Sequence, residues 1–329
     1  MITIFNDKPC FSYGTEDSRP ELIHPMKGIH QIQIYPENNL KEFKGIAFQD
    51  EFTWFVKSDD TPAIERSINN LILGEGFENV TFNCDFLRKP SMIIKKITFP
   101  STLKSFTTLK SECWDRKQLE NPVIELDFSA CGNLTEFIRN DSDKFPNLRI
   151  LNLRRVGEVG QACKQVNFHS FSVVDLKKLR FLCFPYSSML CSDAVTDIGW
   201  STPVGADFIF YYPKFSQECI SNCLINNFII RHDADIADIR GSRHITKSII
   251  KRLILPSKYV EKILSQSINL DFADTKVDEV VIATTATTPV PSDYQNLLKK
   301  LQIRMHPPIN IIDESIDDII TKLKEENME

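Results

Sequence analysis

The sequence predicts an α/β repeat fold: a solenoid whose short parallel strands form one sheet, with helical or irregular segments on the other side. The first observation is the stretch from Val123 to Leu153, which contains one apolar pattern twice. Its alternating part is typical of a short strand, and the later apolar residue belongs to the following turn. The second observation is that the pattern returns from Ile29 to Leu298 at steps of about 24 residues. Since one coil cannot bury its apolar side alone, we expect neighbouring coils to stack on it.

The pattern is strongest in the middle of the chain. The first copy has apolar residues at Val123, Leu126, Phe128, Cys131 and Leu134, and the second begins at Leu148, Leu151, Leu153 and Val156. We expect an N-terminal cap over residues 1–28, a solenoid of about eleven to twelve irregular coils over 29–305, and a C-terminal helical cap over 306–329. The cap over 1–28 contains one strand-like run, from Ile2 to Phe5.

The remaining coils follow in order. Further copies of the pattern begin at Ile29, Phe77, Ile94, Leu179, Ile225, Ile250, Val277 and Leu298, and Phe208 with Phe210 offers one more strand. Residues 44–76 fit poorly, and we expect a helix there. It would begin at Thr61 and Pro62, place Ile64, Ile68 and Leu71 on one face, and end at Gly74.

The end of the chain predicts a helix. Ile316, Ile319, Ile320 and Leu323 form one apolar stripe, and acidic residues in the first turn complement the helix dipole. We expect this helix to cap the stack.

Three segments resemble the BspA-like subgroup of leucine-rich repeats. They are IKKITFPSTLKSF (94–106), LRFLCFPYSSML (179–190) and KRLILPSKYVEKI (251–263), in which a strand ends in proline and a short turn leads to another apolar residue. GIHQIQIYPENNLKEF is similar. The resemblance covers most of the chain from about residue 29 to 305. It implies an interaction surface and no shared chemistry.

The composition limits the partners. A formal net charge of −5 and a pI near 5.8 give no general attraction to nucleic acid or anionic membrane. No run of about 18 apolar residues could span a bilayer, and we expect no secretory signal because the first residues form no apolar segment of the required length. We therefore expect a cytoplasmic protein, with export by a non-classical route as the alternative. The nine cysteines form no C-x-x-C pair, so we expect reduced, mostly buried thiols and no zinc site.

Four residue groups could carry chemistry, and each has a simpler explanation that we favour. They are a metal set (His232, Asp233, Asp235, Asp238), a phosphate grip (Arg240, Gly241, Ser242, Arg243), a thiol triad (Cys163, His169, Asp175) and a cysteine pair (Cys219, Cys223). Solvated loops, turns and core thiols explain them, because no second ligand group lies at a fixed spacing. We therefore expect no catalytic residue, cofactor or metal. An enzyme or effector with a metal or phosphate site in 185–248 stays the alternative.

The strand face is the most informative surface. Residues beside the inward apolar positions point outward, and in the early coils they are polar. The later coils mix apolar, aromatic and arginine residues, which is the composition of protein-binding hot spots. The predicted partner-binding residues are Arg154, Phe181, Tyr211, Ile229, Arg231 and Arg252. The alternative is that the chain's own loops, especially 185–224, cover these positions. We expect a non-enzymatic scaffold that binds a protein. The sequence does not identify this partner or the oligomeric state.

Overall fold

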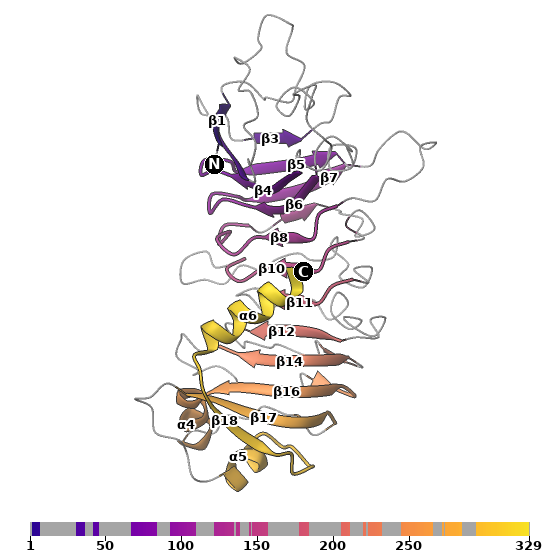
Figure 1. The fold of residues 1–329 in the computed structure, drawn as a ribbon, viewed down its shortest axis with the longest axis vertical. Coiled ribbons are helices and arrows are strands. Elements are labelled where there is room, and N and C mark those ends of the chain that lie inside the picture. Colours follow the sequence, from indigo (N-terminus) through magenta and orange to yellow (C-terminus); the bar gives the residue numbers. More distant parts are fainter. Residues whose placement is uncertain are drawn as a thin grey trace, which may run out of the picture.

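The main feature of the computed structural model is one long parallel sheet. The structure describes residues 2–6, 31–36, 42–45, 67–83, 93–109, 122–134, 136–138, 145, 147–156, 178–183, 205–210, 220–221, 223–231, 245–265, 272, 274–284 and 294–328. Within these residues, a 12-stranded sheet runs the length of the molecule (Figure 1). Its strands, in spatial order, are β1 (Ile2–Asn6), β2 (Gln31–Pro36), β4 (Ser67–Leu73), β6 (Ile93–Thr98), β8 (Glu125–Asp127), β10 (Ile150–Asn152), β11 (Phe181–Cys183), β12 (Ala206–Phe210), β14 (Leu224–Ile230), β16 (Ile249–Pro256), β17 (Lys276–Thr284) and β18 (Ile309–Asp313).

The register of this sheet confirms the predicted repeat. Equivalent residues pair strand by strand in the order Leu71, Ile97, Leu126, Leu151, Leu182, Phe208, Phe228, Leu253 and Val280. These side chains are buried in one apolar core. The chain is therefore a solenoid of parallel strands, and both expected caps contribute a strand to its sheet, β1 at one end and β18 at the other.

A second, shorter parallel sheet faces the first across this core. It contains β3 (Glu42–Gly45), β5 (Asn79–Asn83), β7 (Ser105–Leu109) and β9 (Glu136–Ile138). Each of these strands follows a main-sheet strand directly in the chain, so the early coils have two strands each. The later coils add a small two-stranded sheet of β13 (Ile220–Ser221) and β15 (Ile245–Thr246).

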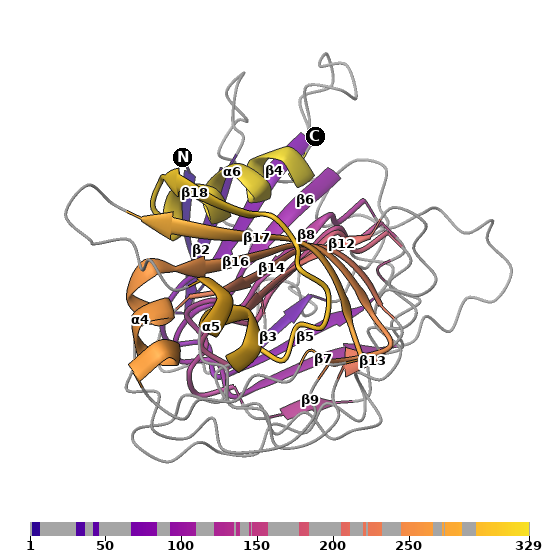
Figure 2. The same cartoon turned by 90° about the horizontal axis from the view of Figure 1, so that it is seen from below.

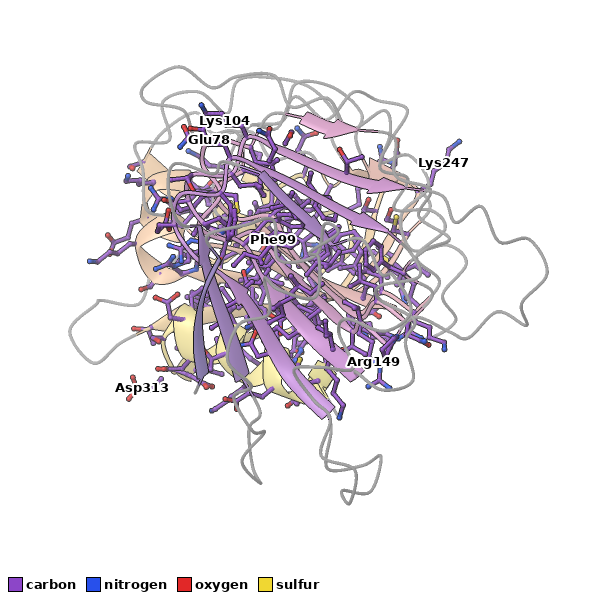
Figure 3. All side chains as sticks on the ribbon, turned by 90° about the horizontal axis from the view of Figure 1, so that it is seen from above. Glu78, Phe99, Lys104, Arg149, Lys247 and Asp313 are labelled. Atoms are coloured by element: carbon purple, nitrogen blue, oxygen red, sulfur yellow. The ribbon has the colours of Figure 1, made fainter. Side chains whose placement is uncertain are left out.

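Stacked aromatic rings fill the core of the early coils. The rings of Phe99 and Phe128 are parallel with centroids 4.1 Å apart, and Phe106 of β7 meets each of them edge-on at 5.2 and 5.3 Å. In the view from above, Phe99 lies in the interior while Glu78 and Lys104 lie near the rim (Figure 3). Lys104 and Glu78 form an ion pair with a distance of 2.7 Å. The inward positions of these coils are therefore apolar, and charged residues lie at the surface.

Three sequence predictions were wrong. The helix expected around Ile68 and Leu71 is strand β4, because these residues and Leu73 satisfy the same apolar pattern as the other coils. The strand expected at Phe77 and Val80 is β5, which belongs to the second sheet.

The third wrong prediction is the strand at 298–303. This segment begins as helix α5 (Tyr294–Lys300), which ends in a Schellman motif: Ile303 N donates to Leu298 O and Gln302 N to Lys299 O, both at 3.0 Å. Gln302 has the left-handed backbone this motif requires, with φ of 55°.

The other two described helices lie on different sides of the main sheet. Helix α4 (Ser257–Ser265) follows β16, and its Tyr259, Val260 and Ile263 join the interior core. Helix α6 (Ile316–Met328) follows β18, turns back and crosses the outer face of the sheet over its middle strands, from β14 to β10 (Figures 1 and 2). The helix and its buried stripe lie where the sequence predicts them. The helix lies on the strand face, so the prediction that it caps the end of the stack is not confirmed.

Candidate functional site

The outward residues of the main sheet form two rows across neighbouring strands. The first row is Lys96, Glu125, Ile150, Phe181, Asp207, Asn227, Arg252 and Glu279. The second row is Thr98, Asp127, Asn152, Cys183, Ile209, Ile229, Ile254 and Val281. These are the positions that strand alternation places on the strand face. Both rows are polar at β6 and β8. The first row is apolar at β10 and β11 and polar again from β12 to β17, whereas the second row is apolar from β11 onward.

The apolar members of these rows form a second buried cluster, separate from the interior core. We call it the apolar patch. It consists of the row members Ile150, Phe181, Cys183, Ile209, Ile229, Ile254 and Val281, together with Ala283 of β17. The stripe of α6 packs on this patch through Ile316, Ile319, Ile320 and Leu323. Phe181 is 1% exposed and Ile229 is 0% exposed. The patch is therefore a helix-binding surface, and α6 occupies it.

Ser315 caps the N-terminus of α6. Its Oγ accepts a hydrogen bond from Asp318 N at 3.1 Å and lies 2.6 Å from Asp318 Oδ2. Only Glu314 and Ser315 separate the helix from β18. This short connection holds α6 close to the sheet.

An ion pair attaches the first turn of α6 to β14. Arg231 donates two hydrogen bonds to Asp317, Nε to Oδ1 and Nη2 to Oδ2, each at 2.9 Å. Parallel double bonds of this kind fix the orientation of both groups as well as their distance. Arg231 thus holds the first turn of the helix at the end of β14.

A second charge contact attaches the last turns of α6 to β8. Lys324 Nζ lies 2.7 Å from Glu125 Oε1 and 3.7 Å from Asp127 Oδ2. Lys96 of β6 approaches the same two carboxylates, at 3.1 and 3.4 Å. Both carboxylates are buried, so each needs a cation or hydrogen-bond donor nearby. Lys324 supplies part of this compensation from the helix.

The pKa values in this contact follow from burial and charge. Burial raises the pKa of Asp127, but Lys324, a hydrogen bond from Ser129 and the charge of Lys96 outweigh burial and leave the pKa below its ordinary value. Burial lowers the pKa of Lys324, but Asp127 and Glu125 outweigh it and leave this pKa raised. Both shifts favour the charged forms, so the contact is an ion pair at neutral pH.

A chain of polar contacts crosses the strand face at the middle of the sheet. Asn327 of α6 donates to Asp207 Oδ2 at 3.1 Å, Asn227 donates to Asp207 Oδ1 at 2.6 Å, and Arg252 Nε donates to Asn227 Oδ1 at 2.7 Å. Burial raises the pKa of Asp207 although both asparagines and Arg252 act to lower it. The sheet therefore also binds a polar residue of the helix, because Asp207 accepts a hydrogen bond from Asn327.

The structure places three of the six predicted partner-binding residues at α6. Phe181 and Ile229 lie beneath the helix, and Arg231 is paired with it. Arg252 is exposed and contacts Asn227, and Arg154 is partly buried just after β10. Tyr211 lies outside the described residues. Helix α6 is the described segment that covers the apolar patch, whereas most of 185–224 lies outside the described residues. Binding of a partner by these residues stays a prediction.

Sequence reasoning singled out Arg231 but missed the other residues that attach the helix. It gave no role in the site to Glu125, Asp127 or Lys324. A signal was present: the apolar stripe of 316–323 has the length and composition to cover the apolar outward positions of the later coils. Matching these two apolar surfaces makes the strand face a candidate position for the helix, beside the end of the stack.

The groups that could carry chemistry lie mostly outside the described residues. This holds for the metal set, the phosphate grip, the thiol triad and Cys219. Cys223 is described and lies buried in the core. Among described residues, no group of three or more His, Cys, Asp or Glu side chains is arranged to hold a metal ion.

Comparisons with known proteins do not identify a family. No protein-family model matches the chain, no curated protein matches it, and no solved structure matches it. In the part of the chain that the structure describes, every helix is too short or too polar to cross a bilayer.

Proposed function

We propose that this protein is a non-enzymatic scaffold that binds a protein partner through the strand face of its solenoid. The observation that carries the proposal is the apolar patch, which already holds a helix between two charged contacts. Surfaces that combine apolar anchors with arginine and buried charge are typical of protein recognition. The expected role of Phe181, Ile229 and Arg231 as partner contacts is part of this proposal.

The repeat type belongs to the same proposal. The turn after β6 has the feature of the BspA-like leucine-rich repeats, since Phe99 and Pro100 close the strand and Leu103 returns to the core. Such repeats serve as interaction surfaces, which agrees with a scaffold. The cytoplasm as its compartment rests on the sequence alone.

The test uses the full chain as bait with two matched variants. Ile320→Asp removes one apolar anchor of α6 and should open the patch. Ile320→Asp combined with Ile229→Asp opens it and places a charge at its centre. Proteins captured from cell extract are purified and their affinities measured by titration calorimetry. The proposal requires a partner that binds the opened variant and binds the doubly substituted chain at least about tenfold more weakly.

A control variant separates the strand face from the rest of the surface. Lys258→Ala changes an exposed residue of α4, on the other side of the main sheet, and should leave the affinity unchanged. A purified partner that loses affinity with Lys258→Ala but keeps it with Ile229→Asp would place the interaction elsewhere and contradict the proposal.

A further inference from the structure

We infer that the partner of the strand face is an amphipathic helix that resembles α6 and replaces it on the apolar patch. This inference rests on the proposed function and names the partner class for the same surface. The occupied site defines the ligand chemistry, because the apolar stripe of α6 and its two charged contacts meet residues of the strand face.

The contacts of α6 translate into a sequence pattern. Apolar residues stand at helix positions 1, 4, 5 and 8, namely Ile316, Ile319, Ile320 and Leu323. An acidic residue follows the first apolar residue and a lysine follows the last one, as Asp317 and Lys324 do. A partner helix with this pattern can pack on the apolar patch, pair with Arg231 at its N-terminal end and with Glu125 and Asp127 at the other. Helix-in-groove recognition generally uses apolar anchors at such spacings.

The two charged contacts also fix the direction of the partner helix. Arg231 follows β14, whereas Glu125 and Asp127 lie on β8, so the cation and the anions contact opposite ends of α6. A helix of reversed direction would bring lysine to Arg231 and an acidic residue to Glu125. Like charges in contact oppose binding, so the sheet selects one direction.

Helix α6 is then an internal competitor for the same surface. An isolated helix of 13 residues is marginal in water, so α6 depends on the patch to stay folded. The two-residue connection to β18 keeps the effective concentration of α6 at the patch high. A partner must displace α6. The apparent affinity of the partner therefore falls in proportion to the small fraction of molecules in which α6 is undocked.

The test measures binding of a fluorescein-labelled peptide of residues 314–328 to full-length protein by fluorescence anisotropy. The hosts are the natural chain, Ile320→Asp, and Ile320→Asp with Ile229→Asp. We expect the peptide to bind Ile320→Asp at least about tenfold more tightly than the natural chain. Binding to the doubly substituted chain should be lost. A control host with Glu325→Ala, an exposed position of α6, should behave as the natural chain does.

Peptide variants test the charge pattern. The Lys324→Glu peptide should bind at least about tenfold more weakly than the natural peptide. An Asp317→Arg peptide should lose affinity similarly and regain it on a host that carries Arg231→Asp with Ile320→Asp. If Ile320→Asp impairs folding, a host with Asp317→Arg and Lys324→Glu opens the patch through charge alone and should bind the natural peptide in its place.

Three results would overturn the inference. The first is equal binding of the peptide to the natural and opened chains, and the second is binding that survives Ile229→Asp. The third is a dimer of the natural chain that Ile320→Asp converts to monomer in light scattering, because the occupant of the patch would then be a second copy.

The proposed function fails in a different way. If the peptide binds as expected but no cellular protein depends on Ile229, the helix site stands and the scaffold role does not. If a cellular partner depends on Ile229 but does not compete with the peptide, the scaffold role stands and the helical partner does not.

Discussion

Lys324 of α6 and Glu125 of β8 form an ion pair of 2.7 Å in which the carboxylate is 1% exposed. This pair links the last described helix to a strand in the middle of the sheet. Removing Lys324 would leave Glu125 and Asp127 with Lys96 as their remaining ammonium partner in the contact. The pair therefore matters for the position of α6 more than surface ion pairs usually do.

Lys324→Met should lower the free energy of unfolding by about 1–3 kcal/mol, because a buried carboxylate loses a charged donor. Lys322→Met is the matched control, since Lys322 lies on the same helix, is exposed and pairs with Glu314 at the surface. It should cause no measurable change. Urea unfolding monitored by circular dichroism measures both. Equal effects of the two substitutions would show that Glu125 does not depend on the helix.

The contribution of Lys324 should depend on pH. The pKa of Asp127 is lowered from 3.8, so its ionised form stabilises the folded state above pH 3.8 and this stability is lost as the pH falls through the lowered pKa. Lys324, with its raised pKa, stays charged throughout this range. Asp207 has a raised pKa and acts in the opposite direction, but it is present in both proteins and cancels in their difference.

The measurement is the difference in unfolding free energy between the natural chain and Lys324→Met as a function of pH. We expect a constant difference from about pH 8 to pH 5 and a smaller one below about pH 4. A difference that already falls between pH 7 and pH 6 would assign the contact to another titrating group.

Leu151→Ala should lower the free energy of unfolding by about 2–5 kcal/mol through lost apolar burial and the cavity that remains. Leu151 is 0% exposed and lies between the equivalent positions Leu126 and Leu182. Glu325→Ala, at an exposed position of α6, is the control and should have little effect. Urea unfolding measures both, and a loss below about 1 kcal/mol at Leu151 would show that this row does not form the core.

Gly205→Ala should lower the free energy of unfolding by about 1–2 kcal/mol, because Gly205 has φ of +76° in the left-handed region. An added Cβ would also lie 2.8 Å from Asn226 Oδ1 and 3.2 Å from Leu224 Cγ. Gly205→Asn is the informative comparison, since asparagine tolerates this backbone better than alanine. If thermal unfolding shows that both substitutions are neutral, the backbone at this turn is not held at positive φ.

The sequence was sufficient for the strand rows because burial on one face repeats with a period of two within every coil. Leu126 and Leu151 could be aligned by pattern alone, and the register confirms this alignment. Two of the three wrong predictions share one cause. The first two apolar residues of the repeat are three positions apart, which is also a helical spacing. Ile68 and Leu71 were therefore interpreted as helix, and Leu298 and Leu301 as strand.

The position of α6 could not be predicted from local pattern. Its stripe shows only that one side is buried, and an end of the stack or the strand face would satisfy that requirement equally. The choice depends on contacts between distant residues, namely Asp317 with Arg231 and Lys324 with Glu125. A single sequence contains no periodic pattern that identifies such pairs.

Hydrogen exchange of the α6 backbone amides tests most directly whether the apolar patch holds this helix. Mass spectrometry compares the full natural chain with Ile229→Asp, which changes the patch and leaves the sequence of the helix intact. Exchange over residues 319–328 should be slow in the natural chain and much faster in the variant, while peptides from β8 and β10 keep their protection. Protection of α6 that is equal in both chains would contradict a helix held by the strand face.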